Sequence, residues 1–335
     1  MNGADMRVRL RPGVRIMWRD ATTLQIGFHT VPIVQVAAPT TEHLKTLTAL
    51  KKHGIRHDRS NPLLAQLSDA KLLLPMAGDD VANFDHASRK RRAADARILG
   101  MQSEGGSGWA HHIARSQAGV EVQGLGRTGA GIARRLVHAG VGRLIIKDGA
   151  TVTWHDVAPG AYSSRRIGDK REIGLRAELE RDAPETVVSS VTDEPPDVTV
   201  LVSYHAISPQ QYRGLMRHDI PHLAVVISDV RASVGPLVLP GRTPCLRCLD
   251  LHRTDADSAW PTLATQLMKA QMDDPEPEES LLADTAATLA AGQVLNSIGR
   301  QRPAAVGATI EFEVFDYLPA LRKWTMHPDC GCAAP

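Results

Sequence analysis

The sequence has few aromatic residues, almost no excess of either charge and no long apolar run. Aromatic side chains make up 4% of the 335 residues, and 39 Lys and Arg stand against 37 Asp and Glu, which gives a net charge of +2. Nucleic-acid-binding proteins usually carry a clear basic excess, and base stacking needs aromatic rings. A membrane-spanning helix needs about 18 or more consecutive apolar residues. We therefore expect neither nucleic acid nor a membrane among the partners of this chain.

The sequence shows no secretory signal and has few cysteines. The arginines near the N-terminus are not followed by the apolar segment of a secretory signal, and the chain has only four cysteines. We therefore expect a cytoplasmic protein whose thiols stay reduced. A chain of this length can bury a large core without crosslinks and suits about two domains.

Apolar spacing divides the chain into three parts. Residues 1–76 alternate like strands over 15–28 and show helical spacing over 42–52, which predicts a small winged-helix-like α+β module. Residues 77–109 combine a basic run with glycine and serine, which predicts a linker. Residues 110–332 are the third part.

Strand-like and helical segments alternate along this third part. The order predicts an α/β fold with a Rossmann-like, mostly parallel sheet and flanking helices. Residues 311–317 predict a late antiparallel strand, and 281–298 predict a long alanine-rich helix. The acidic stretch 273–279, which contains two prolines, predicts a loop before that helix.

A glycine motif lies between the first strand and the first helix of the third part. Gly124, Gly126 and Gly129 form G-x-G-x-x-G, in which the glycines permit a tight turn, a close phosphate and close helix packing. Asp148 follows at the end of the next strand, where a carboxylate can bind a ribose hydroxyl. The motif indicates a nucleotide site, and the alternative is a tight turn without a ligand. It does not separate ATP from a nicotinamide cofactor.

The four cysteines form two close pairs. Cys245 and Cys248 are a C-x-x-C pair, and Cys330 and Cys332 are a C-x-C pair. Two such pairs can close a tetrahedron around a structural zinc ion, and a redox pair is the alternative. A closed zinc site would leave no cysteine for a thioester.

These motifs, taken in order, resemble the ThiF/MoeB superfamily of ubiquitin-activating-enzyme-like proteins. The similarity rests on the glycine loop, residues 139–142, Asp148, Val152, Asp156, residues 233–240 and the cysteine pairs. The resemblance implies adenylation of the C-terminal carboxylate of a small protein or peptide with ATP and magnesium. It also implies a homodimer with a four-cysteine zinc site, and it adds Asp156 to the nucleotide-binding residues.

One branch of the superfamily is favoured by the N-terminal module, by residues 243–250 and by the tail 327–332. These features resemble the ThiF-like partner proteins of cyclodehydratases that form azoles and azolines in peptide natural products. In that branch the N-terminal module binds the leader of a precursor peptide, and a separate YcaO-type protein uses the ATP.

The sequence also departs from the adenylating pattern. The family expects an arginine shortly after the position of Asp156, where residues 157–162 contain none, and a magnesium-binding Asp after the fourth strand, where His205 follows Tyr204. Lys170 or Arg171 remains as the basic catalytic residue. We therefore predict a peptide-binding protein with a degenerate ATP site, and the alternative is an active adenylyltransferase. A nicotinamide-dependent oxidoreductase is disfavoured because no Tyr-x-x-x-Lys follows the glycine loop.

Overall fold

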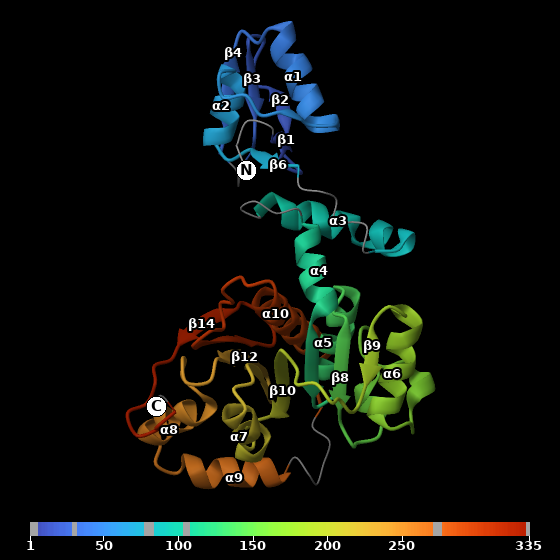
Figure 1. The fold of residues 1–335 in the computed structure, drawn as a ribbon. Helices are drawn as coiled ribbons and strands as arrows, with labels where there is room; N and C mark the ends of the chain where they lie inside the picture. Colours follow the sequence, from blue (N-terminus) through green and yellow to red (C-terminus); the bar gives the residue numbers. More distant parts are fainter. Residues whose placement is uncertain (1–5, 29–31, 77–83, 103–107, 271–276, 333–335) are drawn as a thin grey trace. The chain divides into compact units, whose positions relative to one another are not determined.

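A computed structural model describes residues 6–28, 32–76, 84–102, 108–270 and 277–332. The chain divides into two compact units, Met1–Ile113 and Ala114–Pro335 (Figure 1). Helix α4 (Trp109–Gln117) contains the boundary between them. Each unit has a hydrophobic core of its own.

The first unit combines two small antiparallel sheets with short helices. One sheet has the strand order β5-β1-β6 and the other β2-β3-β4. Its elements are β1 (Arg7–Leu10), β2 (Ile16–Trp18), β3 (Thr23–Ile26), β4 (Val34–Ala37), α1 (Thr41–Lys52), β5 (Ile55–Arg56), α2 (Pro62–Asp69), β6 (Leu73–Pro75) and α3 (His86–Gln102). The strands predicted within 15–28 and the helix predicted at 42–52 are therefore confirmed, whereas the winged-helix class stays a prediction.

Local sequence signals explain where the helices of the first unit begin. Thr40 caps α1 by accepting a hydrogen bond from His43 N, and Asn61 caps α2 ahead of a proline in its first turn. Helix α3 lies in the stretch for which the sequence predicts a linker, and Asp85 accepts a hydrogen bond from Ser88 N at its start. Residues 77–83 and 103–107 of that stretch, including most of its glycines, lie outside the described residues.

The second unit is built on one eight-stranded sheet. The strand order is β14-β13-β12-β11-β10-β7-β8-β9, in which neighbours from β9 to β11 are parallel and those from β11 to β14 antiparallel. The strands are β7 (Gly119–Gln123), β8 (Arg143–Lys147), β9 (Val187–Ser189), β10 (Val198–Tyr204), β11 (His222–Ser228), β12 (Arg231–Val238), β13 (Ala308–Glu313) and β14 (Ala320–Lys323). The predicted parallel α/β sheet and the late antiparallel strand are confirmed.

Helices flank this sheet (Figure 1). They are α5 (Arg127–His138), α6 (Arg171–Asp182), α7 (Pro209–Arg217), α8 (Leu246–Ala256), α9 (Trp260–Ala270) and α10 (Ser280–Ile298). Helix α10 is long and alanine-rich, as predicted, and its small side chains let it approach α5 closely: a Cβ atom at Gly131 would lie 3.0 Å from the Cβ of Ala287. The one buried amide on its apolar face, Gln293, accepts a hydrogen bond from Ala305 N at 3.0 Å.

The carboxyl ends of β7, β8, β10 and β11 lie at one edge of the sheet because these strands are parallel. Ligands of open α/β sheets bind at this edge. The glycine loop follows β7, Asp148 follows β8, and His205 follows β10. No helix among the described residues is long and apolar enough to cross a membrane.

Candidate functional site

The glycine loop joins β7 to α5 at the carboxyl edge of the sheet. Gly124 has a φ of +85°, which favours glycine, and a Cβ atom there would overlap Val202 O. Gly126 is the N-cap of α5, and a Cβ atom at Gly129 would overlap Gly124 O. The loop therefore has the tight turn and the helix N-terminus of an anion site.

Asp148, Asp156 and Arg171 form a closed cluster beside this loop. Arg171 donates from Nη1 to Asp148 Oδ2 at 3.0 Å and from Nη2 to Asp156 Oδ1 at 2.7 Å. All three side chains are almost buried. Burial opposes the charge of Arg171, but the two carboxylates outweigh it and raise the pKa of the guanidinium overall. The structure thus brings three of the predicted site residues together as an ion-paired network.

Asp148 is already occupied by protein donors. In addition to Arg171, it accepts hydrogen bonds from Leu125 N at 2.7 Å and from Ala150 N at 2.8 Å. The carboxylate that would bind a ribose hydroxyl therefore also fixes the glycine loop. Lys170, the other predicted catalytic residue, is exposed and donates from Nζ to Gly149 O at 2.8 Å.

A carboxylate from far along the chain enters the glycine loop. Glu278 is 5% exposed and accepts hydrogen bonds from Thr128 N at 2.8 Å, from the Thr128 hydroxyl and from the Tyr204 hydroxyl at 2.6 Å. Burial and this carboxylate raise the pKa of Tyr204. Sequence reasoning placed Glu278 in a loop and missed this contact, because nothing local marks which acid of the stretch turns inward. Residues 273–276 of that stretch lie outside the described residues.

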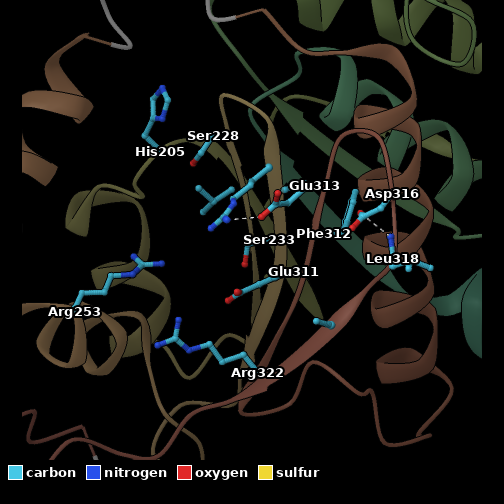
Figure 2. A pocket seen from close by; sticks show the side chains of 14 residues that line it. His205, Ser228, Ser233, Arg253, Glu311, Phe312, Glu313, Asp316, Leu318 and Arg322 are labelled. Carbon is cyan, nitrogen blue, oxygen red and sulfur yellow. Dashed lines mark hydrogen bonds and ion pairs between the residues drawn. The ribbon is translucent and has the colours of Figure 1, made fainter. Parts of the chain in front are cut away.

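A cavity of about 510 Å³ lies next to the end of β10. His205, whose φ is +56°, lines it, while the preceding Tyr204 contacts Glu278 in the glycine loop. Figure 2 shows that Arg253 and Arg322 reach the cavity from α8 and β14, and that Glu311 and Glu313 come from β13. Both charge signs thus line this cavity, and the residue before His205 contacts the carboxylate that lies on the glycine loop.

The four cysteines meet at the start of α8. Cys245 Sγ lies 3.4 Å from Cys330 Sγ and 3.9 Å from Cys248 Sγ, and Cys248 Sγ lies 3.4 Å from Cys332 Sγ. None is in a disulfide. Four sulfurs at about 2.3 Å from a tetrahedral zinc ion would be about 3.8 Å apart, so the cluster fits that metal. Burial raises the pKa of Cys245, and a divalent cation would stabilise the thiolates that burial disfavours.

His327 supports this cluster from the side. Its Nδ1 accepts a hydrogen bond from Asp329 N at 3.1 Å, and its Nε2 lies 2.9 Å from Asp255 Oδ2. An Nδ1 that accepts leaves the ring proton on Nε2, which donates to Asp255. Neither ring nitrogen then offers a lone pair to a metal, and His327 instead ties the tail to α8.

Comparison with solved structures identifies the fold, whereas no protein-family model and no curated protein matches the chain. E. coli MccB with MccA-N7isoASN superposes with a TM-score of 0.70 at 16% identity, over 98% of this chain and 100% of that one. The microcin C7 biosynthetic enzyme MccB with N-formylated MccA gives 0.72 at 15% identity over the same shares.

This chain has the fold of MccB. PaaA has a similar fold, with a TM-score of 0.67 at 14% identity over 94% of this chain and 99% of that one. Because the match to MccB covers nearly all of both chains, it includes both units. The resemblance to ThiF/MoeB-like proteins is thereby confirmed at the level of the fold. E. coli MccB has also been solved with ATP.

Proposed function

We propose that this chain binds the leader of a precursor peptide and presents it to a partner enzyme, with an ATP site that no longer supports adenylation. The partner would be a YcaO-type cyclodehydratase, and the working form a homodimer with one structural zinc per chain. The fold of MccB, which has been solved with MccA, supports a peptide-related role.

One observation carries the proposal: the cations beside the glycine loop are committed to protein partners. Arg171 is paired with Asp148 and Asp156. Arg127 donates from Nη1 to Glu278 O at 2.6 Å and from Nη2 to Val157 O at 3.2 Å. Phosphoryl and adenylyl transfer need cations and a metal to neutralise developing charge, and one such donor is worth about 3 kcal/mol.

The cavity beside His205 is the proposed position for the segment of the peptide that the partner modifies. Arg231 forms an ion pair with Glu313 at its wall, and Arg253 and Arg322 add two further guanidiniums. Such a wall can bind carboxylates and backbone carbonyls of an extended peptide. Figure 2 shows Arg253, Arg322 and Glu313 around one open space.

The first unit is the proposed position for the leader. Among the described residues, β4 pairs with β3 alone, so its other edge can accept an extended peptide as an added strand. This would be the peptide-recognition role that the sequence predicts for the winged-helix-like module 1–76.

Peptide binding is tested by fluorescence anisotropy with labelled peptides from short reading frames beside the gene. We expect the full chain to bind one of them and to show no ATP–pyrophosphate exchange. Arg322→Glu should weaken binding about tenfold or more, because it places a carboxylate at the cavity wall. Arg213→Glu, on the exposed side of α7, is the matched control and should bind like the native chain. Failure to bind any such peptide would overturn the proposal.

The second candidate is an active adenylyltransferase, and the MccB structure with ATP favours it. In that reaction a peptide carboxylate attacks the α-phosphorus of ATP and releases pyrophosphate. Peptide-dependent exchange of labelled pyrophosphate into ATP would establish this activity in place of presentation.

A further inference from the structure

The carboxylate of Glu278 lies where the glycine loop would hold a phosphate. Thr128 N, in the first turn of α5, points its hydrogen at Glu278 Oε2 over 2.8 Å, and the Thr128 hydroxyl donates to the same oxygen. A Cβ atom at Gly126 would overlap Glu278 Oε1, so the carboxylate rests directly on the loop. The position that glycine keeps open for a close ligand is filled by a side chain of the same chain.

The surroundings suit a resident anion. The N-terminus of a helix carries partial positive charge and unpaired N–H groups, which attract carboxylates and phosphates alike. Tyr204 holds the second oxygen of Glu278 at 2.6 Å. Among the described residues Glu278 has no salt bridge, so these donors and α5 supply its counter-charge.

The backbone at Glu278 and just after it is also fixed. Arg127, the first residue of α5, donates to Glu278 O at 2.6 Å and to Ser280 Oγ at 3.2 Å. Glu279 caps α10 by accepting from Leu282 N at 2.8 Å. The side chain of Glu278 is therefore held in the loop by its own hydrogen bonds and by the contacts of the residues that follow it.

We propose that Glu278 acts as an internal substitute for a nucleotide phosphate and blocks the glycine loop of its own chain. The inference rests on the proposed function and adds a reason why the site does not support adenylation. The glycine loop retains its shape, but Glu278 occupies the position where it would bind an anion. A nucleoside triphosphate enters only in molecules whose Glu278 has left the loop. The apparent affinity for the nucleotide is reduced in proportion to the fraction of molecules with an open loop. It falls about tenfold if one molecule in ten is open.

The test compares ATP binding, with magnesium, by isothermal titration calorimetry of the full chain and three variants. Glu278→Ala empties the anion position and should bind ATP about tenfold or more tightly than the native chain. Glu278→Gln keeps the size of the side chain and removes its charge, so it should show a smaller gain. Glu180→Gln removes an exposed carboxylate of α6 and should bind like the native chain.

Two results would overturn the inference: equal ATP affinity in the native chain and Glu278→Ala, or the same gain in Glu180→Gln. A melting curve establishes that each variant is folded, and Glu278→Gln serves if Glu278→Ala does not fold. The proposed function fails separately, through pyrophosphate exchange or absent peptide binding by the native chain. Neither of those measurements depends on how Glu278 variants bind ATP.

Discussion

At the scale of single residues, Arg171 shows how a residue predicted to act in catalysis can be needed for the fold. Its guanidinium neutralises Asp148 and Asp156, and the three side chains are 12%, 11% and 3% exposed. Removing one partner of a buried ion pair leaves an uncompensated charge.

We therefore predict that Arg171→Ala lowers the free energy of unfolding by about 3–5 kcal/mol. Lys170→Ala, at the neighbouring exposed position, should change it by less than about 0.5 kcal/mol. Urea denaturation followed by circular dichroism measures both. Equal effects of the two substitutions would contradict the buried-pair interpretation.

His222 makes stability depend on pH. Burial lowers its pKa below the ordinary value of 6.5, and its Nε2 has no hydrogen-bond partner among the described residues. Below pH 6.5 the His222 side chain binds a proton in the unfolded chain but not in the folded chain. The stability that neutral His222 contributes is therefore lost as the pH falls below 6.5, and it is constant at higher pH.

We predict that His222→Asn, which can keep the bond to Ile220 O, reduces the loss of stability below pH 6.5. The substitution should reduce the slope of the free energy of unfolding against pH by at most about 1.4 kcal/mol per pH unit. Denaturation midpoints between pH 5 and 8 measure it, with the exposed His218→Asn as control. An unchanged pH profile in His222→Asn would refute the assignment.

Residue-level prediction from the sequence succeeded where neighbours in the chain decide the structure. The glycine loop and Asp148 follow from strand, turn and helix signals within about 25 residues. Glu278, by contrast, reaches Thr128 across 150 residues. Contacts of that kind are set by the whole fold and leave no local pattern.

At the scale of elements, glycines in α5 and α10 have opposite roles. A Cβ atom at Gly129 would overlap the backbone of Gly124, whereas one at Gly292 in α10 would meet no atom within 4 Å. We predict that Gly129→Ala destabilises the protein by about 1–3 kcal/mol. Gly292→Ala should stabilise it by about 0.5–1 kcal/mol, because alanine restricts the unfolded helix segment. Thermal melts of both variants check the signs, and two destabilised variants would contradict the packing described for α10.

The elements that sequence reasoning found are those with a clear apolar period. Strands β7, β8 and β10 are buried and rich in valine, leucine and isoleucine, which identifies them. Strand β14 is exposed at every position, and α3 carries mostly charged residues and alanine, so neither has an apolar face to recognise. Strand β14 forms because it pairs with β13.

At the scale of the whole molecule, the two units have separate cores, and the four-cysteine cluster belongs to the second. We predict that a zinc chelator, or Cys330→Ser, lowers the melting temperature of the second unit by several degrees and leaves the first unit unaffected. Hydrogen exchange resolved along the full chain measures both units in one sample. Equal loss of protection in residues 6–76 would show that the units unfold together.

The cysteine cluster also has a consequence for the synthesis of this chain on the ribosome. Cys245 and Cys330 are 85 residues apart, so the ribosome must add all of those residues before the cluster can close. At about 5–20 residues per second this takes roughly 4–17 s, during which the first pair is exposed as free thiols. Oxidation of Cys245 and Cys248 to a disulfide within that time would remove both thiols before their partners are synthesised, so the order of synthesis makes the cluster sensitive to oxidants while the chain is still growing.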